Sequence, residues 1–400
     1  MITSNVCFLN SNNGNGLLAF GGKDILVIEH IHSLTEIDTF ISDRPNKYIF
    51  LCLSYDLKNG IESLDSKNND SVCFPDLVFW CPECVFDIKN ESLNLLQGAS
   101  TAEQYKFAKD FISQSKSPNH KEVKVQFEAQ ISKDTYLNKV NAIKKHIQRG
   151  DIYEVNFCQE YVAKNIEKER VKEFYTNLNG ITKAPFSSYF KFANFEVFCG
   201  SPERFIKKEG DILTAQPIKG TAKRGNNKSE DLELVDHLKN DPKERAENIM
   251  IVDLMRNDLS KIAKKGSVNV DELCEVYTYK TVHQMVSKVS CHLKENLTFT
   301  DIIKATFPMG SMTGAPKIRA MELIEEYEDF KRGLYSGSIG YISPNGDFDL
   351  NVVIRTIIYN SKLKSLSCGV GSAITIKSDA ENEYEECGIK VQKILDGISG

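Results

Sequence analysis

Lys219 stands in the segment QPIKGTAKRG, where three different chemistries are open to a lysine. Its ammonium could be solvated at the surface, could bind a phosphate, or could lose its proton and attack carbon. The segment lacks the G-x-x-x-x-G-K-[ST] frame of a phosphate-binding loop, which argues against the second chemistry. An ordinary lysine has a pKa of about 10.4, so only about one in two thousand is a free amine at neutral pH. If Lys219 is a nucleophile, we expect burial and the charges of Lys223 and Arg224 to lower its pKa.

Two segments repeat a pair of glutamates at a spacing of three residues. Glu244 and Glu247 lie in ERAEN, and Glu383 and Glu386 lie in ENEYEECGIK, where Lys390 follows one helical turn later. On a helix this spacing places both carboxylates of a pair on one face, where like charges repel by about 0.2–0.5 kcal/mol. If the two helices face each other, these oxygens suit a hard ion such as Mg²⁺. Taken alone, the spacing favours two solvated helix faces, because glutamate is common on helix surfaces.

The segments that must position these residues carry both helical and strand-like patterns. Tyr136, Val140, Ile143 and Ile147 recur at helical spacing before Gly150, which predicts a helix that stops there. Runs of helices and runs of strands, rather than strict alternation, predict the α+β class. The other predicted elements are strands over 152–163 and 282–293, helices over 229–241 and from Pro242 onward, a helix opening at Pro316, strand-like runs over 335–343, 350–360 and 366–376, and a last helix over 379–395.

The first 115 or so residues differ in pattern from the rest. Short apolar runs such as ILVIE, YIFLCLSYD and LVFWCPECVFDI alternate with polar turns, which predicts a strand-rich N-terminal part. The polar stretch SQSKSPNHKEVK that follows is typical of a loop or a boundary. We therefore divide the chain into residues 1–120, the strand-rich part of the fold, and residues 121–400, the catalytic region.

Composition limits the class of protein. With 41% hydrophobic and 26% charged residues, a chain of 400 residues can bury a large core. The net charge of -5 gives no general attraction to nucleic acid or to anionic lipid. The N-terminus lacks a basic start followed by an apolar run, and no run of about 18 apolar residues occurs. We expect a cytoplasmic protein that binds neither nucleic acid nor membrane.

Eleven scattered cysteines predict reduced thiols rather than a disulfide framework. Cys81 and Cys84 in WCPEC could form half of a zinc site, but such a site needs a second pair of cysteines or histidines at suitable spacing. The next candidates in the chain are isolated, so structural cysteines are the preferred interpretation.

Six motifs occur in order along the chain: SPERF, QPIKGTAKRG, ERAENIMIVDLMRND, FPMGSMTGAPKIRAMELIE, YSGSIGYIS and CGVGSAITIKSDAENEYEECGIK. In this combination the chain resembles the chorismate-utilising enzymes over about residues 130–398, and among them the large subunits of aminodeoxychorismate synthase. The resemblance implies an anthranilate synthase-like fold of two packed β-sheets with outer helices. Lys219 is the distinguishing residue, because anthranilate synthases typically carry alanine in the same P-I-x-G-T context.

The resemblance implies a covalent route through Lys219. Its amine would attack chorismate at C2 as the 4-hydroxyl leaves, and ammonia would then add at C4 and displace the lysine. Glu203 in SPERF matches the family's general acid, so we expect a partly apolar pocket to raise its pKa. His283 in TVHQMV matches the family's active-site histidine and is expected to line the pocket, with a catalytic role left open. A lone histidine in a strand is otherwise more often a core residue.

The same resemblance implies how a dianionic substrate is bound. Glu247 and Glu386 would hold Mg²⁺ against the ring carboxylate, with Glu244 and Glu383 behind them. The enolpyruvyl carboxylate would meet Arg355, whose guanidinium suits a carboxylate. The other matched positions around the ligand are Ser311, Tyr335, Gly369, Gly371 and Lys390. For the tyrosine and the two glycines, packing explains the residue types nearly as well.

Glu154 in GDIYEVNFCQEY departs from the family pattern. This position corresponds to lysine in members that activate water and often to glutamine in members that use ammonia. The missing lysine argues against isochorismate or salicylate synthesis, and the glutamate leaves the handling of ammonia open.

A source of ammonia is also implied. No segment carries the G-x-C-x-G elbow of a glutaminase, so we expect a separate glutamine amidotransferase subunit to supply it. The expected function is conversion of chorismate and ammonia to 4-amino-4-deoxychorismate, for 4-aminobenzoate and folate synthesis. The alternatives are anthranilate synthase component I, whose product lacks the enolpyruvyl group, and an inactive chorismate-binding scaffold. The general acid, the lysine and the four carboxylates argue against the scaffold.

Overall fold

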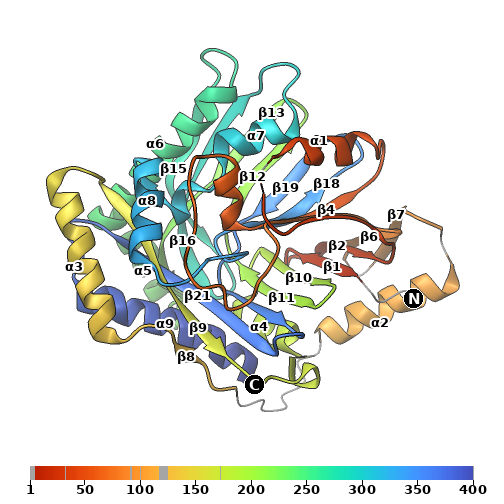
Figure 1. The fold of residues 1–400 in the computed structure, drawn as a ribbon, viewed down its shortest axis with the longest axis horizontal. Coiled ribbons are helices and arrows are strands. Elements are labelled where there is room, and N and C mark those ends of the chain that lie inside the picture. The colour runs from red at the N-terminus through yellow and green to blue at the C-terminus, as the bar shows by residue number, and fades with distance from the viewer. Residues whose placement is uncertain are drawn as a thin grey trace.

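The computed structural model describes residues 5–399 of the chain except 32, 91, 100, 117–124 and 172. Within them, two antiparallel β-sheets pack together and helices cover their outer faces (Figure 1). The predicted α+β fold of two packed sheets with outer helices is confirmed. The polar segment around residue 120, where we divided the chain, falls largely outside the described residues.

The larger sheet contains eleven of the described strands. Its two longest strands, β9 (Glu154–Ala163) and β21 (Ser365–Ile374), pair with each other, and β9 is buried along nearly its whole length. A strand covered on both faces reads as a continuous buried run, as β9 does. In order across the sheet the strands are β17 (Gly314–Ala315), β9, β21, β20 (Thr356–Asn360), β11 (Phe195–Ser201), β10 (Phe186–Phe192), β1 (Val6–Asn10), β2 (Asn15–Phe20), β6 (Cys84–Lys89) and β7 (Ser92–Gln97), and β8 (Glu128–Ala129) pairs with β9.

The second sheet contains ten of the described strands. Their order is β14 (Ile218–Lys223), β16 (Val282–His292), β13 (Ile212–Gln216), β12 (Arg204–Glu209), β19 (Phe348–Asn351), β18 (Ser338–Ile342), β4 (Ile49–Leu53), β5 (Leu77–Cys81) and β3 (Asp24–Ile28), and β15 (Asn269–Thr278) pairs with β16. The N-terminal strands are shared between the sheets, because β1, β2, β6 and β7 join the first while β3, β4 and β5 join the second. Two helices, α1 (Thr35–Ser42) and α2 (Ala102–Lys116), accompany them.

Three apolar layers hold the sheets and helices together. Phe50, Trp80 and Val197 belong to the layer between the two sheets. The layer outside the eleven-stranded sheet includes Phe157 and residues of α3 (Lys133–Arg149), α4 (Phe174–Thr182), α8 (Lys317–Tyr327) and α9 (Ala380–Ser399). The layer outside the ten-stranded sheet includes Met255 and residues of α1, α6 (Pro242–Ile262) and α7 (Phe299–Thr306). Short 3₁₀ turns cover Tyr55–Gly60, Lys168–Val171 and Gly310–Met312.

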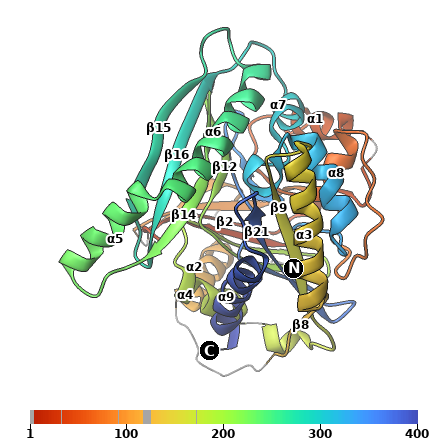
Figure 2. The same cartoon turned by 90° about the vertical axis from the view of Figure 1, so that its left-hand side faces the viewer.

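Figure 2 shows how the helices flank the sheets. The helices α5 (Lys228–Asn240) and α6 follow β14, β15 and β16 on one side, while α3 and α9 lie along β9 and β21 on the other. The edge strand β14 and the strand β9, which lies next to the short edge strand β17, are therefore flanked by helices from different parts of the chain.

Capping side chains fix the ends of the helices that matter for the site. The Ser132 hydroxyl accepts a backbone N–H from the first turn of α3, and Gly150 ends this helix with a left-handed φ of 85°. The Asp241 carboxylate accepts two N–H groups from the first turn of α6, where Pro242 stands first. These bonds satisfy donors that have no partner inside a helix. The helix predicted to stop at Gly150 and the helix predicted from Pro242 are both confirmed.

The strand-like run over residues 350–360 is not one strand, as the sequence had suggested. Its first residues belong to β19 in one sheet and its last residues to β20 in the other. The chain crosses between the sheets here, and Arg355 takes a left-handed φ of 52° in the crossing. Glu203 lies in a second crossing, from β11 to β12. The two crossings are neighbours, because β11 pairs with β20 and β12 pairs with β19.

The cysteines agree with the expectation of reduced thiols. All eleven cysteines are free thiols, and all but Cys73 are buried. Cys81 ends β5 and Cys84 begins β6, which are strands of different sheets. In the part of the chain that the structure describes, no helix is both long and apolar enough to cross a bilayer.

Candidate active site

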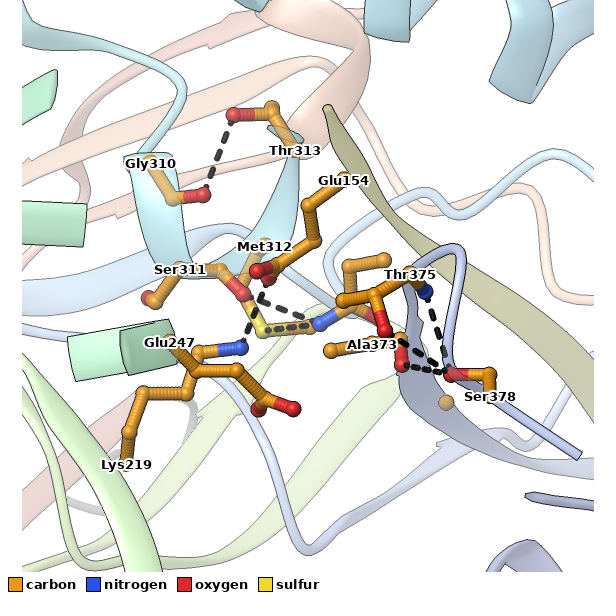
Figure 3. Close-up of polar contacts among 12 residues, drawn as sticks. Glu154, Lys219, Glu247, Gly310, Ser311, Met312, Thr313, Ala373, Thr375 and Ser378 are labelled. Atoms are coloured by element: carbon orange, nitrogen blue, oxygen red, sulfur yellow. Dashed lines mark hydrogen bonds and ion pairs between the residues drawn. The ribbon is translucent and has the colours of Figure 1, made fainter. Parts of the chain in front are cut away.

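Lys219 and Glu154 meet between the edges of the two sheets. Lys219 lies on the edge strand β14, and Glu154 is the first residue of β9. The Lys219 Nζ donates a hydrogen bond to Glu154 Oε1 at 2.9 Å (Figure 3). Only 12% of the lysine side chain and 1% of the glutamate side chain is exposed. The sequence singled out both residues, but it gave no sign that they form a pair.

The pKa of Lys219 was expected to be lowered, and this prediction is wrong. Burial lowers the pKa of Lys219, but the charges of Glu154 and Glu247 outweigh it and raise the pKa to about 12. Arg224 was expected to lower the pKa of Lys219 by its positive charge, yet it pairs with both carboxylate oxygens of Asp231 instead. Lys223, the other cation in question, is exposed. Lys219 is therefore an ammonium in the resting protein.

Glu203 lies buried in the crossing from β11 to β12, with 5% of the residue exposed. Burial raises its pKa to about 7, and the Ser311 side chain and the Lys219 charge oppose that rise. A carboxyl group with this pKa keeps its proton in about half of the molecules at neutral pH. The expected raised pKa of Glu203 is thus found, and its cause is burial.

Arg355 acts on Glu203 from the neighbouring crossing. Burial lowers the pKa of Arg355, and the charge of Glu203 opposes this. No hydrogen bond or ion pair holds the guanidinium within the described residues. Ser311, in the turn Gly310–Met312, is also buried. Its hydroxyl influences Glu203 but makes no hydrogen bond of normal geometry in the same part of the chain. Both side chains are free to bind a ligand.

Packing explains the glycines at 369 and 371. A Cβ atom on Gly369 would lie 2.4 Å from the ring of Tyr335, and one on Gly371 would lie 2.5 Å from Cys158 Sγ. Tyr335 itself is buried, and its hydroxyl accepts a contact from Cys158 Sγ at 3.9 Å. Lys390 donates a hydrogen bond to the Gly371 carbonyl at 3.0 Å. These residues therefore form one packed group of β9, β21, α9 and the segment before β18, and close packing alone requires the two glycines.

The four predicted metal-binding glutamates share a lysine that the sequence analysis overlooked. Lys243 Nζ lies 3.9 Å from Glu247 Oε1 on its own helix and 3.9 Å from Glu383 Oε1 on α9. Burial lowers the pKa of Lys243, but the four carboxylates together raise it. Glu386 pairs with Lys390 at 2.6 Å. Burial raises the pKa of Glu386, but the charges of Lys390, Lys243 and Lys219 outweigh burial and lower it. Lys243 stands four residues before Glu247, a spacing at which helix side chains meet, so a signal was present.

The four glutamates offer only carboxylate oxygens as metal ligands. Glu247 Oε1 is buried without a hydrogen-bond donor in the described part of the chain, and burial raises the pKa of Glu247 to about 7. Carboxylates with no histidine or cysteine ligand among them fit a hard divalent ion such as Mg²⁺. As the described side chains stand, no three acidic, histidine or cysteine groups converge closely enough to hold one. The donor set fits Mg²⁺, while Lys243 supplies the positive charge in this structure.

His283 lies on β16, where it pairs in register with Ala222 of β14, the strand that carries Lys219. Its Nδ1 meets Thr278 Oγ1 at 2.9 Å, and its Nε2 meets Asp231 Oδ1 at 2.8 Å. Both ring nitrogens are engaged, one of them by a residue of α5, and the expected place of His283 in the pocket stays a prediction. Gln284, the next residue, faces the opposite side of β16 because strand side chains alternate. It is buried, and its Oε1 has no partner in the described part of the chain.

The arrangement combines a buried lysine, an acid with a pKa near neutrality and a group of carboxylates. Glu203 can donate a proton, and the Lys219 amine can attack carbon once it has lost its own. Arg355 offers an unpaired cation for an anionic ligand. The site therefore suits an anionic substrate whose reaction uses a proton donor and an amine.

Comparisons with known proteins show the family of the chain. The chorismate binding enzyme family matches residues 13–396 of the chain. The chain is 34% identical to aminodeoxychorismate synthase component 1 of Bacillus subtilis (strain 168), over 84% of this chain and 73% of that protein. It is 36% identical to an anthranilate synthase component I-like protein of Synechocystis sp., over 87% of this chain and 72% of that protein.

A solved structure shares the fold. The crystal structure of anthranilate synthase component I from Streptococcus pneumoniae TIGR4 superposes with a TM-score of 0.76 at 26% sequence identity. The match covers 98% of this chain and 90% of that one. The two-sheet architecture is therefore common to both proteins.

Proposed function

The chain belongs to the chorismate binding enzyme family, and on that premise we propose that it is aminodeoxychorismate synthase component I. The reaction converts chorismate and ammonia to 4-amino-4-deoxychorismate, and the product serves 4-aminobenzoate and folate synthesis. One observation carries the proposal: a buried lysine, Lys219, interacts through its charge with the buried carboxyl group of Glu203, whose pKa is raised. Relatives that bear the name aminodeoxychorismate synthase, such as the one from Bacillus subtilis, support it.

The reaction at the ring uses two side chains. Glu203 gives its proton to the 4-hydroxyl, which leaves as water while the Lys219 amine bonds to C2. Ammonia then adds at C4, the C2–N bond breaks, and Lys219 departs with its electron pair. The retained enolpyruvyl group distinguishes this product from anthranilate. The raised pKa of Glu203 supports its role, because an acid must hold a proton before the leaving group departs.

The remaining polar groups bind the substrate. The unpaired guanidinium of Arg355 receives the enolpyruvyl carboxylate, with Tyr335, Ser311, Lys390 and the backbone at Gly369 and Gly371 around the ligand. When bound by Glu247 and Glu386, with Glu244 and Glu383 beside them, Mg²⁺ would supply the positive charge that neutralises the ring carboxylate. We leave His283 out of this set, since its ring nitrogens are engaged elsewhere.

Ammonia comes from a separate glutamine amidotransferase subunit in this proposal, and the protein acts in the cytoplasm. The name component 1 of the Bacillus subtilis relative supports a second component.

The test is incubation of the purified chain with chorismate, ammonium chloride and MgCl₂, followed by mass spectrometry of the product. The proposal expects a mass change that corresponds to replacement of one hydroxyl by an amine. Anthranilate would assign the chain to the other synthase, and isochorismate or no turnover would reject the proposal.

A further inference from the structure

Lys219 is a positively charged ammonium in the resting protein, whereas a nucleophile must be a neutral amine. An ammonium has no free electron pair, and at a pKa of about 12 only about one lysine in 10⁵ is a free amine at pH 7. The proton must therefore leave Lys219 before carbon is attacked, and a nearby group must accept it.

The surroundings limit which group can accept this proton. The charges that act on Lys219 come from Glu154 on β9, Glu247 on α6 and Glu203 in the crossing before β12. More weakly coupled are Glu244 and Glu386, whose own pKa values respond to Lys219. Glu203 has to hold a proton for the leaving hydroxyl, so it cannot also be the deprotonated carboxylate that accepts the proton of Lys219. Glu247 and the other two acids belong to the group around Lys243.

Glu154 alone has the contact that proton transfer requires. In the described part of the chain it is the one hydrogen-bond partner of Lys219 Nζ, at 2.9 Å. Its second oxygen, Oε2, is buried and has no partner there. The carboxylate thus has no other donor that competes for its charge.

We infer that Glu154 is the positioning residue that takes the proton from Lys219 and aims the freed amine at the substrate ring. This inference rests on the proposed function. The ammonium and carboxylate become an amine and a carboxylic acid, the amine bonds to C2, and the C4–O bond breaks with the proton of Glu203. After ammonia displaces the lysine, its new C4–NH₃⁺ group returns a proton to Glu203, and Glu154 returns its proton to Lys219. The sum is chorismate plus ammonia to aminodeoxychorismate plus water.

Burial favours the transfer once the substrate fills the site. Taking an ion pair out of water is costly, whereas a neutral amine beside a neutral acid loses much less hydration. Exclusion of water therefore reduces the free-energy difference between the ion pair and the neutral amine–acid pair. The hydrogen bond between Lys219 and Glu154 already provides the path for the proton.

The pair has a kinetic signature. The reactive form of the wild type holds the same number of protons as the resting ion pair, so its population does not depend on pH. In Glu154→Gln the side chain has nearly the same shape but cannot take the proton, so Lys219 must lose it to solvent. Its free fraction then rises about tenfold for each pH unit below its pKa. The rate ratio of wild type to E154Q should therefore fall about tenfold per pH unit, and the common dependence on Glu203 cancels in this ratio.

The experiment measures kcat and KM for chorismate from pH 5.5 to 8.5 with saturating ammonium and MgCl₂. For E154Q we expect kcat to fall by about 10²–10⁴ near pH 6, with KM for chorismate within about threefold of the wild type. Glu154→Asp keeps a carboxylate, so it should retain the pH dependence of the wild type at a lower rate. Glu160→Gln is the matched control, because Glu160 is a buried glutamate of the same strand whose side chain contacts Ser71 and Ser367 instead.

Each outcome bears on a different conclusion. If wild type forms the amine product and E154Q matches it within about threefold at every pH, the role of Glu154 is wrong while the proposed function stands. If wild type forms no such product, the proposed function fails first. If E154Q is slow by a constant factor at every pH, Glu154 orients Lys219 without taking its proton, and the inference is overturned. Circular dichroism and thermal unfolding of each variant separate these results from loss of the fold.

Discussion

Lys243 on α6 reaches across to α9, where its Nζ lies 3.9 Å from Glu383 Oε1. The same ammonium lies 3.9 Å from Glu247 Oε1, so one cation joins the two helices that carry the paired glutamates. The glutamates are thus neither plain solvated faces nor an assembled metal site in this structure. A lysine in such a position competes with any divalent ion for the same carboxylates.

Replacement of Lys243 by alanine should tighten Mg²⁺ binding several-fold. The ion no longer has to displace an ammonium from Glu247 and Glu383, and the uncompensated carboxylates attract it more strongly. Isothermal titration calorimetry with MgCl₂ at constant ionic strength measures the effect. Lys239→Ala, which removes an exposed lysine of α5, serves as control. Weaker binding in Lys243→Ala would show that the ammonium and the ion use different groups.

Replacement of Lys219 by alanine should remove aminodeoxychorismate formation, with a loss of at least about a thousandfold in kcat. The amine that bonds to C2 is then missing, and some anthranilate can form in its place. Mass spectrometry of the products distinguishes the two compounds. Lys223→Ala changes an exposed lysine of the same strand and should leave the product unchanged. Normal turnover in Lys219→Ala would contradict the covalent route.

Glu203 should make the reaction depend on pH with a falling limb near pH 7. Its pKa is about 7, and only the protonated form can assist the leaving hydroxyl. The wild-type kcat/KM should therefore be constant below pH 6 and fall about tenfold per unit above pH 8. Glu203→Gln should lower kcat by about 10²–10⁴. Glu196→Gln, on the buried strand before it, should keep the wild-type profile. A profile that does not decline up to pH 9 would exclude Glu203 as the acid.

Glu160 should make the stability of the fold depend on pH. Burial raises its pKa from 4.5 to about 7, although Ser367 and Ser71 oppose this by hydrogen bonding. Between these values the folded protein keeps a proton that the unfolded chain has lost, so stability falls as pH rises. Glu160→Gln cannot titrate, and its unfolding free energy relative to wild type should rise by about 2.5 kcal/mol between pH 5 and pH 8. Urea unfolding at both pH values measures this. An equal difference at the two values would contradict the raised pKa.

The sequence specified much of the fold and many of the helix and strand positions. The helical spacing before Gly150 and the Asp241–Pro242 start of α6 are local features, so they appear in the structure where the sequence predicts them. The run over residues 350–360 is a counterexample. Its residue types suit a strand throughout, but the two halves join different sheets. The local sequence does not indicate which sheet a strand will join, because the strands that pair with it come from distant parts of the chain.

The sequence by itself determined the chemical groups of the site, from Lys219 and Glu203 to the two glutamate pairs. Only the tertiary structure decided their charges and partners. The pKa of Lys219 is raised, although its neighbours in the sequence had suggested that it would be lowered. The reason is that the charges of Glu154 and Glu247 act on it, while Arg224 pairs with Asp231. His283 forms a hydrogen bond with the same aspartate, which lies on α5. The physical reason is that a pKa depends on burial and on charges a few ångströms away, and both are set by the packing of elements that lie far apart in the chain.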